Sequence, residues 1–600
     1  MISFLFLMII VVSCFCMSKL VIRDSFLKSE SFEENLLINM GLGLGIMSYM
    51  IFFCAILGLL YKSVFLILIF VPILLIIIKN KKICISNNFG KLSDYTFELK
   101  LMIFLIIFSS LVYIIATSKP TFDSDSLCYH LPVAKYFLNA HKMINISEFQ
   151  QYASFPQFGE MLYVLALGLK DEILVQQIHL LAGFLSVFIV FVMIRKYFNL
   201  TSALLSALLF LLSSYFSTQF GTAMIDFFVL LYFTLVLYTF LKWYDTKHNK
   251  WFCLMSIFLG FCFAVKYTGV IAFIIPVGYF LIQIVHKRFF NKNNSKLILI
   301  LFCVFIPVFP WLLRNYIFTN NPFSPFLNSI FNDKSLNSFL ILDMKNHFIA
   351  CKNIKNFMSY FTYIFELFIA EPTMFLFLLF PFYRNKNYHF KFIIYYVFTY
   401  LLVGTFIFPH ITRFFVVVIP FVIAIGVVSS VDMMKRNKLI KIFIILFLVG
   451  SIGNRSYELV LSLASRDGIK YFLGKYSKHE YLEKYANFYM PYINENLNEN
   501  DKILSINETR GYYYEPIFIK TSSSKFGSFV HSISDEKNLI KKFYEKQIKY
   551  MFVSRSDYFQ KHQRPTLLTD AKVLNKNFEL IAKHDVNYLY RLKDREVLEI

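Results

Sequence analysis

The sequence predicts a polytopic α-helical membrane protein of about 13 or 14 transmembrane helices, followed by a small C-terminal α/β domain. Hydrophobic residues make up 57% of the 600 residues and aromatic residues 19%, more than in an ordinary soluble domain. Many apolar segments reach the roughly 18 residues that a helix needs to cross a bilayer. They lack the period-two alternation of barrel strands, so we interpret them as helices.

The positive charge of the chain indicates a membrane topology and no nucleic-acid partner. The formal net charge is +22, and lysines and arginines gather in short loops between apolar segments, as the positive-inside rule requires. Spans placed between these loops return all of them to one side, which we take as the cytoplasm. The loops lie at 79–91, 195–196, 242–250, 286–296, 384–391 and 435–441. The loop 118–160 and everything after Arg455 then face outward.

Three regions are expected along the chain. Residues 1–99 hold three apolar segments (2–17, 36–61 and 63–78), and the first lacks the basic start of a signal peptide. In the second, Gly41 and Gly45 have the small-xxx-small spacing of close helix packing. Residues 100–454 are expected to form the main membrane region. Its spans are 101–116, 174–194, 201–216, 221–241, 251–266, 268–285, 297–313, 358–382, 392–408, 413–431 and 438–454.

Residues 455–600 are polar and long enough for one small domain outside the membrane. A strand is predicted over 502–506, a helix over 537–546 and a further strand over 548–554, which is an alternation typical of an α/β domain. The nine cysteines of the whole chain lie mostly in apolar segments and form no CxxC pair. They therefore indicate neither a zinc site nor a disulfide framework.

The external loop 118–160 carries the densest set of chemically active side chains. Asp123 and Asp125 are followed by Tyr129, His130 and Lys135. The two carboxylates could converge on a divalent metal, or one could act as a general base that the other orients. The alternative is a solvated turn in which Asp125 caps a helix over 129–138.

Two further acidic positions lie in apolar segments. Asp226 is near the outer end of a span, where an ionised carboxylate needs a cation, a metal or a water-filled cavity to compensate its charge. The alternative is that Asp226 only caps the helix or extends to the membrane interface. Glu366 and Glu371 lie in another apolar segment and could form a relay; alternatively, Pro372 breaks the helix there.

Several cations lie on the same predicted outer side as these acids. Lys266 separates two apolar halves, Arg314 ends one span and Arg413 begins another. These three could clamp a phosphate at the membrane surface, and Lys135 is a further cation on that side. The alternative is ordinary anchoring to lipid headgroups.

At these residues the chain resembles the GT-C superfamily of polytopic glycosyltransferases. It is similar to bacterial relatives of dolichyl-phosphate-mannose protein mannosyltransferases and of lipid A aminoarabinose transferases, over roughly residues 100 to 600. The resemblance rests on 125–135 (DSLCYHLPVAK), 155–163 (FPQFGEMLY), 224–226 (MID), 266–269 (KYTG), 310–315 (PWLLRN) with 321–322 (NP), Arg413 before FF, and 507–513 (NETRGYY).

The resemblance implies an inverting transfer of a sugar from a polyprenyl-phosphate donor at the outer face of the membrane. Asp125 matches the catalytic acid of the first external loop and Asp226 the second acid, with Asp123 as an accessory. The mannosyltransferases carry an Asp-Glu pair in this loop, whereas this chain has Asp125-Ser126. We expect substrate binding by Tyr129, His130, Lys135, Lys266, Arg314 and Arg413.

Asp125 would be the general base for an acceptor hydroxyl of a lipid, a protein or a polysaccharide. No cofactor is required by the sequence, although Asp123 and Asp125 could hold a divalent metal. The expected location is the plasma membrane of a bacterium. A glycan polymerase is one alternative function, and a transporter or flippase of lipid-linked glycans is another, although no internal repeat is evident.

Overall fold

The computed structural model describes residues 2–22, 30–79, 92–146, 151–286, 292–336, 340–342, 345–346, 357–385, 388–407, 411–521, 529–531, 533–555 and 567–594. They form two compact units. The helical unit comprises Met1–Lys119, Pro156–Trp311 and Phe348–Ile469. The mixed unit comprises Pro120–Phe155, Leu312–His347 and Lys470–Ile600. Each unit is described by itself.

The predicted polytopic helical fold is confirmed. Within the described ranges, nine helical segments are long and apolar enough to cross a membrane, and a bent pair makes a tenth. The nine are α1 (Ile2–Val21), α2 (Phe32–Leu57), α4 (Phe97–Ala116), α7 (Glu172–Tyr197), α10 (Asp226–Thr246), Tyr267–Val285 with α12 (Ile274–Val285), Ser295–Thr319 with α13 (Lys292–Leu301) and α14 (Phe305–Thr319), α18 (Tyr388–Ile407) and α20 (Lys438–Ala464).

The number of full-length spans is lower than the 13 or 14 predicted, because several apolar segments form helices of 17 residues or fewer. These are α3 (Lys62–Ile78), α6 (Phe158–Leu169), α8 (Leu200–Leu212), α11 (Asn249–Val265) and α19 (Ile419–Met434). The end of α8 has a local cause. Ser213 is extended, and its side chain accepts a hydrogen bond from the amide of Phe216, which starts the short helix α9 (Ser214–Ser217).

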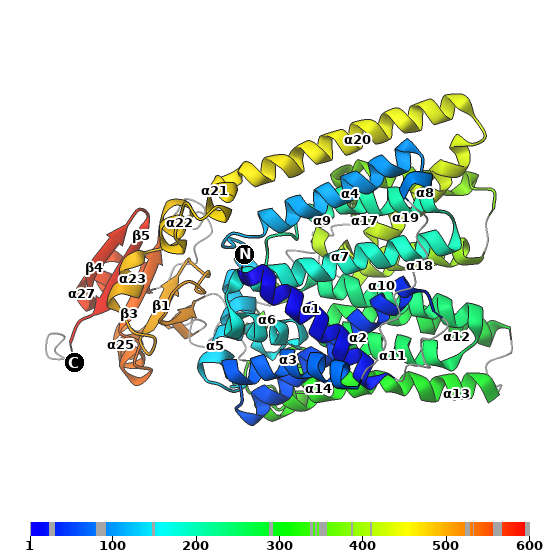
Figure 1. The fold of residues 1–600 in the computed structure, drawn as a ribbon. Helices are drawn as coiled ribbons and strands as arrows, with labels where there is room; N and C mark the ends of the chain where they lie inside the picture. Colours follow the sequence, from blue (N-terminus) through cyan, green and yellow to red (C-terminus); the bar gives the residue numbers. More distant parts are fainter. Residues whose placement is uncertain are drawn as a thin grey trace. The chain divides into compact units, whose positions relative to one another are not determined.

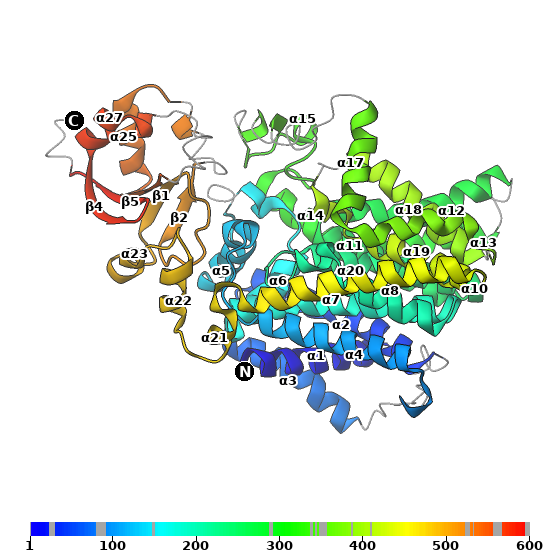
Figure 2. The same ribbon diagram turned by 90° about the horizontal axis from the view of Figure 1, so that it is seen from above.

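Helix α10 forms the centre of the helical unit. It packs against α7, α11 and α2, and 94% of its apolar window is buried (Figures 1 and 2). Gly41 of α2 permits this packing, since a Cβ there would lie 2.4 Å from the Leu235 side chain of α10. A Cβ at Gly45 would lie 2.3 Å from Phe261 of α11. The predicted close packing at these two glycines is therefore confirmed.

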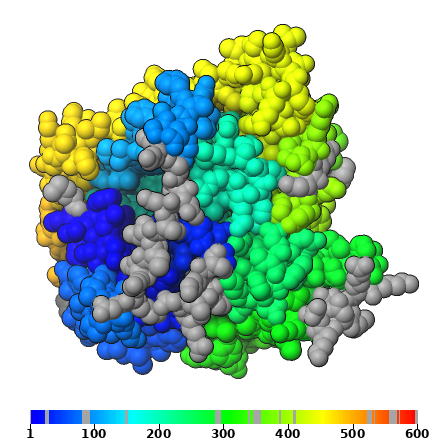
Figure 3. All heavy atoms as spheres, turned by 45° about the vertical axis from the view of Figure 1, so that its right-hand side comes forward, coloured from blue at the N-terminus to red at the C-terminus, as the bar shows by residue number. Residues whose placement is uncertain are grey.

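Other helices of this unit lie at its periphery. Helices α4 and α20 pack on each other and on α8, and much of α20 is exposed (Figure 3). Helix α17 (Phe357–Ala370) and the following 3₁₀ helix (Pro372–Phe382) bend by 109°. Between them the buried Glu371 accepts hydrogen bonds from the amide of Ser214 at 2.8 Å and from the hydroxyl of Thr373 at 2.7 Å. The break at Pro372 is the correct interpretation, and Glu371 links the start of the 3₁₀ helix to the first residue of α9.

The mixed unit contains a five-stranded sheet of order β2-β1-β3-β5-β4. Strands β1 (Lys502–Ile506), β2 (Ile517–Lys520) and β3 (Tyr550–Ser554) are parallel, and β4 (Phe578–His584) and β5 (Asn587–Leu592) are antiparallel to their neighbours. Helix α25 (Glu536–Glu545) adds three buried apolar side chains to the core, those of Leu539, Ile540 and Phe543. The predicted strands over 502–506 and 548–554 and the helix over 537–546 are confirmed.

Shorter helices complete this unit. They are α5 (Leu131–Asn139), α15 (Asn328–Phe331), α22 (Lys478–Tyr485), α23 (Pro491–Asn496) and α27 (Ala571–Asn577), while α21 (Gly468–Phe472) follows α20. Helix α22 begins with a capping box, in which Ser477 and Glu480 exchange hydrogen bonds between side chain and backbone.

Candidate functional site

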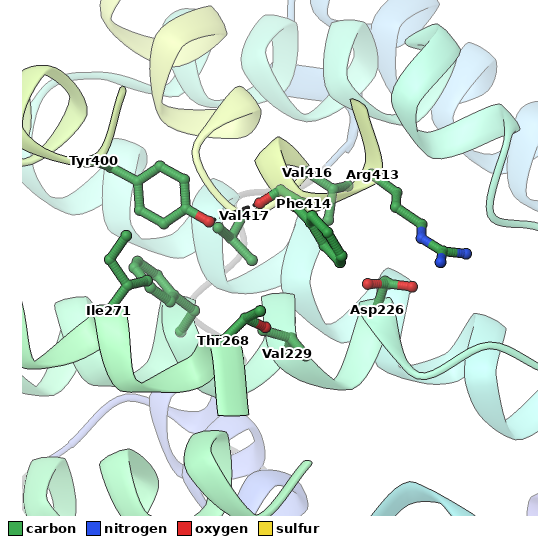
Figure 4. A pocket seen from close by; sticks show the side chains of 10 residues that line it. Asp226, Val229, Thr268, Ile271, Tyr400, Arg413, Phe414, Val416 and Val417 are labelled. Carbon is green, nitrogen blue, oxygen red and sulfur yellow. Dashed lines mark hydrogen bonds between the residues drawn. The ribbon is translucent and has the colours of Figure 1, made fainter. Parts of the chain in front are cut away.

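A buried cluster of one acid and two cations lies in the helical unit. Asp226 is the first residue of α10, Lys266 follows the end of α11, and Arg413 lies in a 3₁₀ turn (Thr412–Phe415) before α19. Lys266 Nζ is 3.1 Å from Asp226 Oδ1. The Arg413 guanidinium points toward the same carboxylate (Figure 4). The structure thus brings together three residues that the sequence singled out separately.

Local backbone structure explains how these side chains meet. Lys266 has an extended backbone (φ −161°, ψ 140°) between α11 and the 3₁₀ segment Tyr267–Phe273, so it interrupts the apolar run as predicted. The ring of Phe414 lies beside both cations, 4.5 Å from Lys266 Nζ and 5.8 Å from Arg413 Cζ. His179 of α7 accepts a hydrogen bond of 3.2 Å from the amide of Phe227 and so stabilises the first turn of α10.

A small pocket opens beside this cluster. Its enclosed volume is about 10 Å³, roughly the space of one water molecule. Asp226 and Arg413 form its polar side (Figure 4). The rest of the lining is mostly apolar or aromatic: Val229, Phe233, Thr268, Ile271, Tyr400, Phe414, Val416 and Val417. Such a combination suits a ligand with an anionic group joined to an apolar one.

The acidic loop lies in the mixed unit. Asp123 Oδ2 accepts hydrogen bonds from the amide and the hydroxyl of Ser126, at 2.8 and 2.6 Å. Asp123, and not Asp125, therefore caps the helix, which corrects the alternative considered for Asp125. Burial raises the pKa of Asp123, and the hydrogen bonds from Ser126 oppose this rise. The carboxylate of Asp125 accepts a hydrogen bond of 3.2 Å from the hydroxyl of Tyr129.

The turn after these acids is a π-helix over Ser126–His130 that continues as α5. Its two aromatic residues, Tyr129 and His130, have ring centres 4.1 Å apart, and Tyr152 lies 4.9 Å from Tyr129. Single π-turns inside helices occur frequently at functional sites. The arrangement gives Asp125 an aromatic neighbourhood that suits a sugar ring.

Arg314, the third predicted phosphate ligand, and Lys135, which was predicted to bind substrate, have structural contacts within the mixed unit. Lys135 Nζ donates to the carbonyl of Tyr514 at 3.0 Å and lies 3.1 Å from Glu515. Arg314 is buried and donates to the carbonyl of Ala153 and to the side chain of Asn315, both at 2.6 Å. These contacts hold loops in place, and a role of either cation toward a phosphate stays a prediction.

Metal binding by Asp123 and Asp125 also stays a prediction. Across the parts of the chain that the structure describes, no three His, Cys, Asp or Glu side chains form a group that could hold a metal ion.

Lys520 was missed by sequence reasoning, and Glu508 and Arg510, which lie in the stretch 507–513 that carries the resemblance, were given no role of their own. Glu508 and Arg510 form a two-pronged ion pair, with Nε–Oε1 and Nη2–Oε2 distances of 2.8 and 2.7 Å. Lys520, at the end of β2, is only 2% exposed and donates to the carbonyl of Cys128. The one signal for Lys520 was a lysine closing the apolar strand Ile517–Lys520, which alone does not reveal its partner.

Comparisons with known proteins agree with this fold. Residues 162–312 match the family model described as dolichyl-phosphate-mannose-protein mannosyltransferase. The structure is similar to that of ArnT from Cupriavidus metallidurans in the apo state, with 12% identity, a TM-score of 0.52, and 83% of this chain and 98% of that chain covered. For ArnT bound to undecaprenyl phosphate, the identity is 13% and the TM-score 0.51, with 82% of this chain and 98% of that chain covered.

The oligosaccharyltransferase of Archaeoglobus fulgidus tethered with an acceptor peptide aligns with 12% identity and a TM-score of 0.49, over 83% of this chain and 74% of that chain. By sequence, no match was found among the curated proteins. The family match and the similarity to ArnT confirm the resemblance to the GT-C superfamily.

Proposed function

We propose that this chain, which has the fold of GT-C glycosyltransferases, transfers a sugar from a polyprenyl-phosphate donor to an acceptor hydroxyl. The observation that carries the proposal is the buried cluster of Asp226, Lys266 and Arg413 beside an apolar pocket. Two cations and one carboxylate leave a net positive charge there. A lipid phosphate would place its charge beside the cations and its first apolar carbons against the pocket wall.

The leaving group of this reaction explains why two cations are useful. As the bond between the anomeric carbon and the phosphate oxygen breaks, its electron pair moves to the lipid phosphate and increases the negative charge. Cations already fixed in a site with little water stabilise that charge more than the ground state. Asp226 would orient Lys266 and Arg413 before the donor arrives. The ArnT structure bound to undecaprenyl phosphate shows that a protein of this fold accommodates such a carrier.

Asp125 is the proposed general base. It would accept the proton of the acceptor hydroxyl while the acceptor oxygen forms its bond to the anomeric carbon and the lipid phosphate leaves, which inverts that carbon. The Tyr129 hydroxyl, 3.2 Å from the carboxylate, would orient it. Tyr129 and His130 offer aromatic and polar contacts for the sugar, and Asp123 fixes the turn through Ser126.

Orientation and acceptor belong to the same proposal. The positive-inside rule supports an orientation in which the acidic loop and the sheet lie outside the cytoplasm, in the plasma membrane of a bacterium. The acceptor would be a lipid, a protein or a polysaccharide reached from that side.

A transfer assay tests the proposal. The full chain in nanodiscs would receive a panel of radiolabelled undecaprenyl-phosphate sugars, and we expect one of them to be consumed. Asp125→Asn should lower the rate by about 10²-fold or more, which is typical for loss of a general base. Ser124→Ala, at the exposed residue between the two aspartates, is the matched control and should keep the rate.

Two outcomes would contradict the proposal. Normal turnover by Asp125→Asn would remove its role as the base. No consumption of any donor by folded protein would refute the transferase function and favour a glycan polymerase or a transporter, for which the next observation would be a co-purified lipid-linked glycan.

A further inference from the structure

The loop that follows α14 has polar side chains inside and apolar side chains outside. It covers residues 320–335 of the mixed unit. Its apolar side chains at Phe326, Leu327 and Ile330 are 51%, 48% and 70% exposed. Four of its polar side chains are buried, those of Asn321, Ser324, Asp333 and Ser335. Loops in water show the opposite arrangement, so this face of the loop indicates a partner other than water.

Hydrogen bonds inside the loop fix this arrangement. The side-chain amide of Asn321 donates to the carbonyl of Phe326 at 2.7 Å and to Asp333 Oδ2 at 3.3 Å. Asp333 Oδ1 accepts from the amide and the hydroxyl of Ser335, at 2.8 and 2.5 Å. The side chain of Asn328 accepts from the amide of Asp333 at 2.7 Å. Buried polar groups that are bonded to one another in this way define a single conformation, in which the apolar side chains lie on the outside.

Both ends of the loop are held at the last turn of α14. The amide of Lys334 donates to the carbonyl of Thr319 at 2.9 Å, and the Thr319 hydroxyl donates to the carbonyl of Asn321 at 3.1 Å. Thr319 is also the end of the candidate membrane span Ser295–Thr319, whose 25 residues form about 37 Å of helix, enough to cross a hydrocarbon core of about 30 Å. One residue extends the chain by at most about 3.5 Å, so Ile330 lies within about 14 Å of Lys334. The exposed apolar side chains are therefore close to the point where the chain leaves the membrane.

The last turns of α14 carry a face of the same character. Leu313, Tyr316 and Ile317 recur at helical spacing, and all three side chains are exposed. On a membrane span, such a face contacts lipid, because lipid chains are as apolar as the side chains themselves. The loop continues this apolar surface beyond the end of the helix.

We propose that the face formed by Phe326, Leu327 and Ile330 inserts into the lipid bilayer at the leaflet where α14 ends. Its partner is the part of the acyl chains that lies next to the headgroups. The inference goes beyond the proposed function and does not depend on it.

Contacts within the mixed unit connect this face to the end of the acidic loop. The rings of Phe326 and Phe155 are stacked, with their centres 6.2 Å apart. Arg314 of α14 donates to the carbonyl of Ala153 at 2.6 Å. An inserted face would therefore hold residues 153–155 at a fixed depth beside the end of α14.

The test places a fluorescent reporter on this face of the full chain. The three native tryptophans, Trp243, Trp251 and Trp311, are buried, so an added tryptophan reports on its own surroundings. Ile330→Trp would be reconstituted at one copy per nanodisc in phosphatidylcholine with brominated acyl chains, because bromine quenches tryptophan on contact. Apolar side chains of interfacial segments reach about 5–10 Å into the boundary between headgroups and acyl chains, so bromine near the glycerol end should remove about half of the added fluorescence. Bromine near the methyl end should remove less, and iodide in the water should remove little.

Two further variants complete the test. Leu580→Trp is the matched control, because Leu580 of β4 is an apolar residue of the same unit that is 49% exposed. Its fluorescence should be quenched by iodide and not by brominated lipid. Phe326→Trp is a second probe that keeps an aromatic ring beside Phe155, and it should respond as Ile330→Trp does. It also serves alone if Ile330→Trp does not fold.

Three results would overturn the inference. Quenching of the probes by iodide but not by brominated lipid would show that water covers this face. Protection from both quenchers in a nanodisc that holds one copy would show that another part of the chain covers it. Shielding that occurs only with two copies per nanodisc would make a second copy the partner. The readout involves no turnover, so the proposed transferase function would stand in each case.

Discussion

The ion pair between Asp226 and Lys266 allows a quantitative test of the proposed phosphate site. Its charged atoms are 3.1 Å apart, and the side chains are 6% and 21% exposed. At an effective dielectric constant near 20, two unit charges at this distance attract by about 5 kcal/mol. Desolvation consumes part of this energy. Removal of one partner from a buried pair costs about 3–5 kcal/mol, and we expect about 3 because Lys266 is partly exposed.

The two single variants should differ in a way that the cluster explains. Lys266→Met leaves the Asp226 carboxylate beside Arg413, whose guanidinium points toward it (Figure 4). Asp226→Asn leaves two cations without their carboxylate, so it should destabilise the protein more. In the double variant neither Asp226 nor Lys266 is left as an unpaired charge. Its loss of unfolding free energy should therefore be smaller than the sum of the two single losses by about 2 kcal/mol.

Unfolding in mixed micelles with increasing SDS would measure these free energies, and donor turnover would be measured on the same preparations. We expect the double variant to recover stability relative to Asp226→Asn but not turnover, since it lacks a cation for the phosphate. Additive effects within about 0.5 kcal/mol would show that the pair does not interact. Recovered turnover in the double variant would show that the cluster is only structural.

Three further predictions concern other charges and the topology. Arg413→Ala should raise KM for the donor and lower kcat, and unchanged values would remove this residue from the phosphate site. The pKa of Asp123 is raised in the folded state, so folded protein binds more protons there than unfolded protein. The free energy of unfolding should therefore fall as pH rises from about 4 through the folded pKa. Asp123→Asn keeps an acceptor for Ser126, and its free energy of unfolding should fall less over the same pH range. A periplasmic reporter fused after Ile600 should be active, and activity of a cytoplasmic reporter there would reverse the orientation.

Most of the fold was predictable because its signals are local. Apolar length identifies the spans, and alternation of strand and helix patterns identifies the C-terminal domain. The number of spans was less predictable. Whether an apolar segment of 13–17 residues continues as helix depends on single positions such as Ser213, which ends α8, and Lys266, which ends α11.

The candidate site was only partly predictable for a different reason. Asp226, Lys266 and Arg413 each stood out, since a charge in an apolar run is costly. They meet because α10 packs against α11 and because the 3₁₀ turn Thr412–Phe415 brings Arg413 beside them, and the sequence alone specifies neither arrangement. Lys520 did not stand out at all, because a lysine at the end of a strand is normally solvated. Its burial depends on the contact between the end of β2 and the Cys128 carbonyl, which the sequence alone does not specify.

A second cluster of charges, far from Asp226 along α10, bears on the topology. Lys242 of α10 lies 2.5 Å from Glu30 and 3.2 Å from Glu34, while Lys196 of α7 lies 2.6 Å from Glu34. The basic loops at 195–196 and 242–250 therefore lie at the same end of the helical unit, as the spans placed between them require. The start of α2 lies there too. Acidic residues contribute little to the positive-inside rule, so the pairing with Glu30 and Glu34 does not cancel the prediction that this end is cytoplasmic.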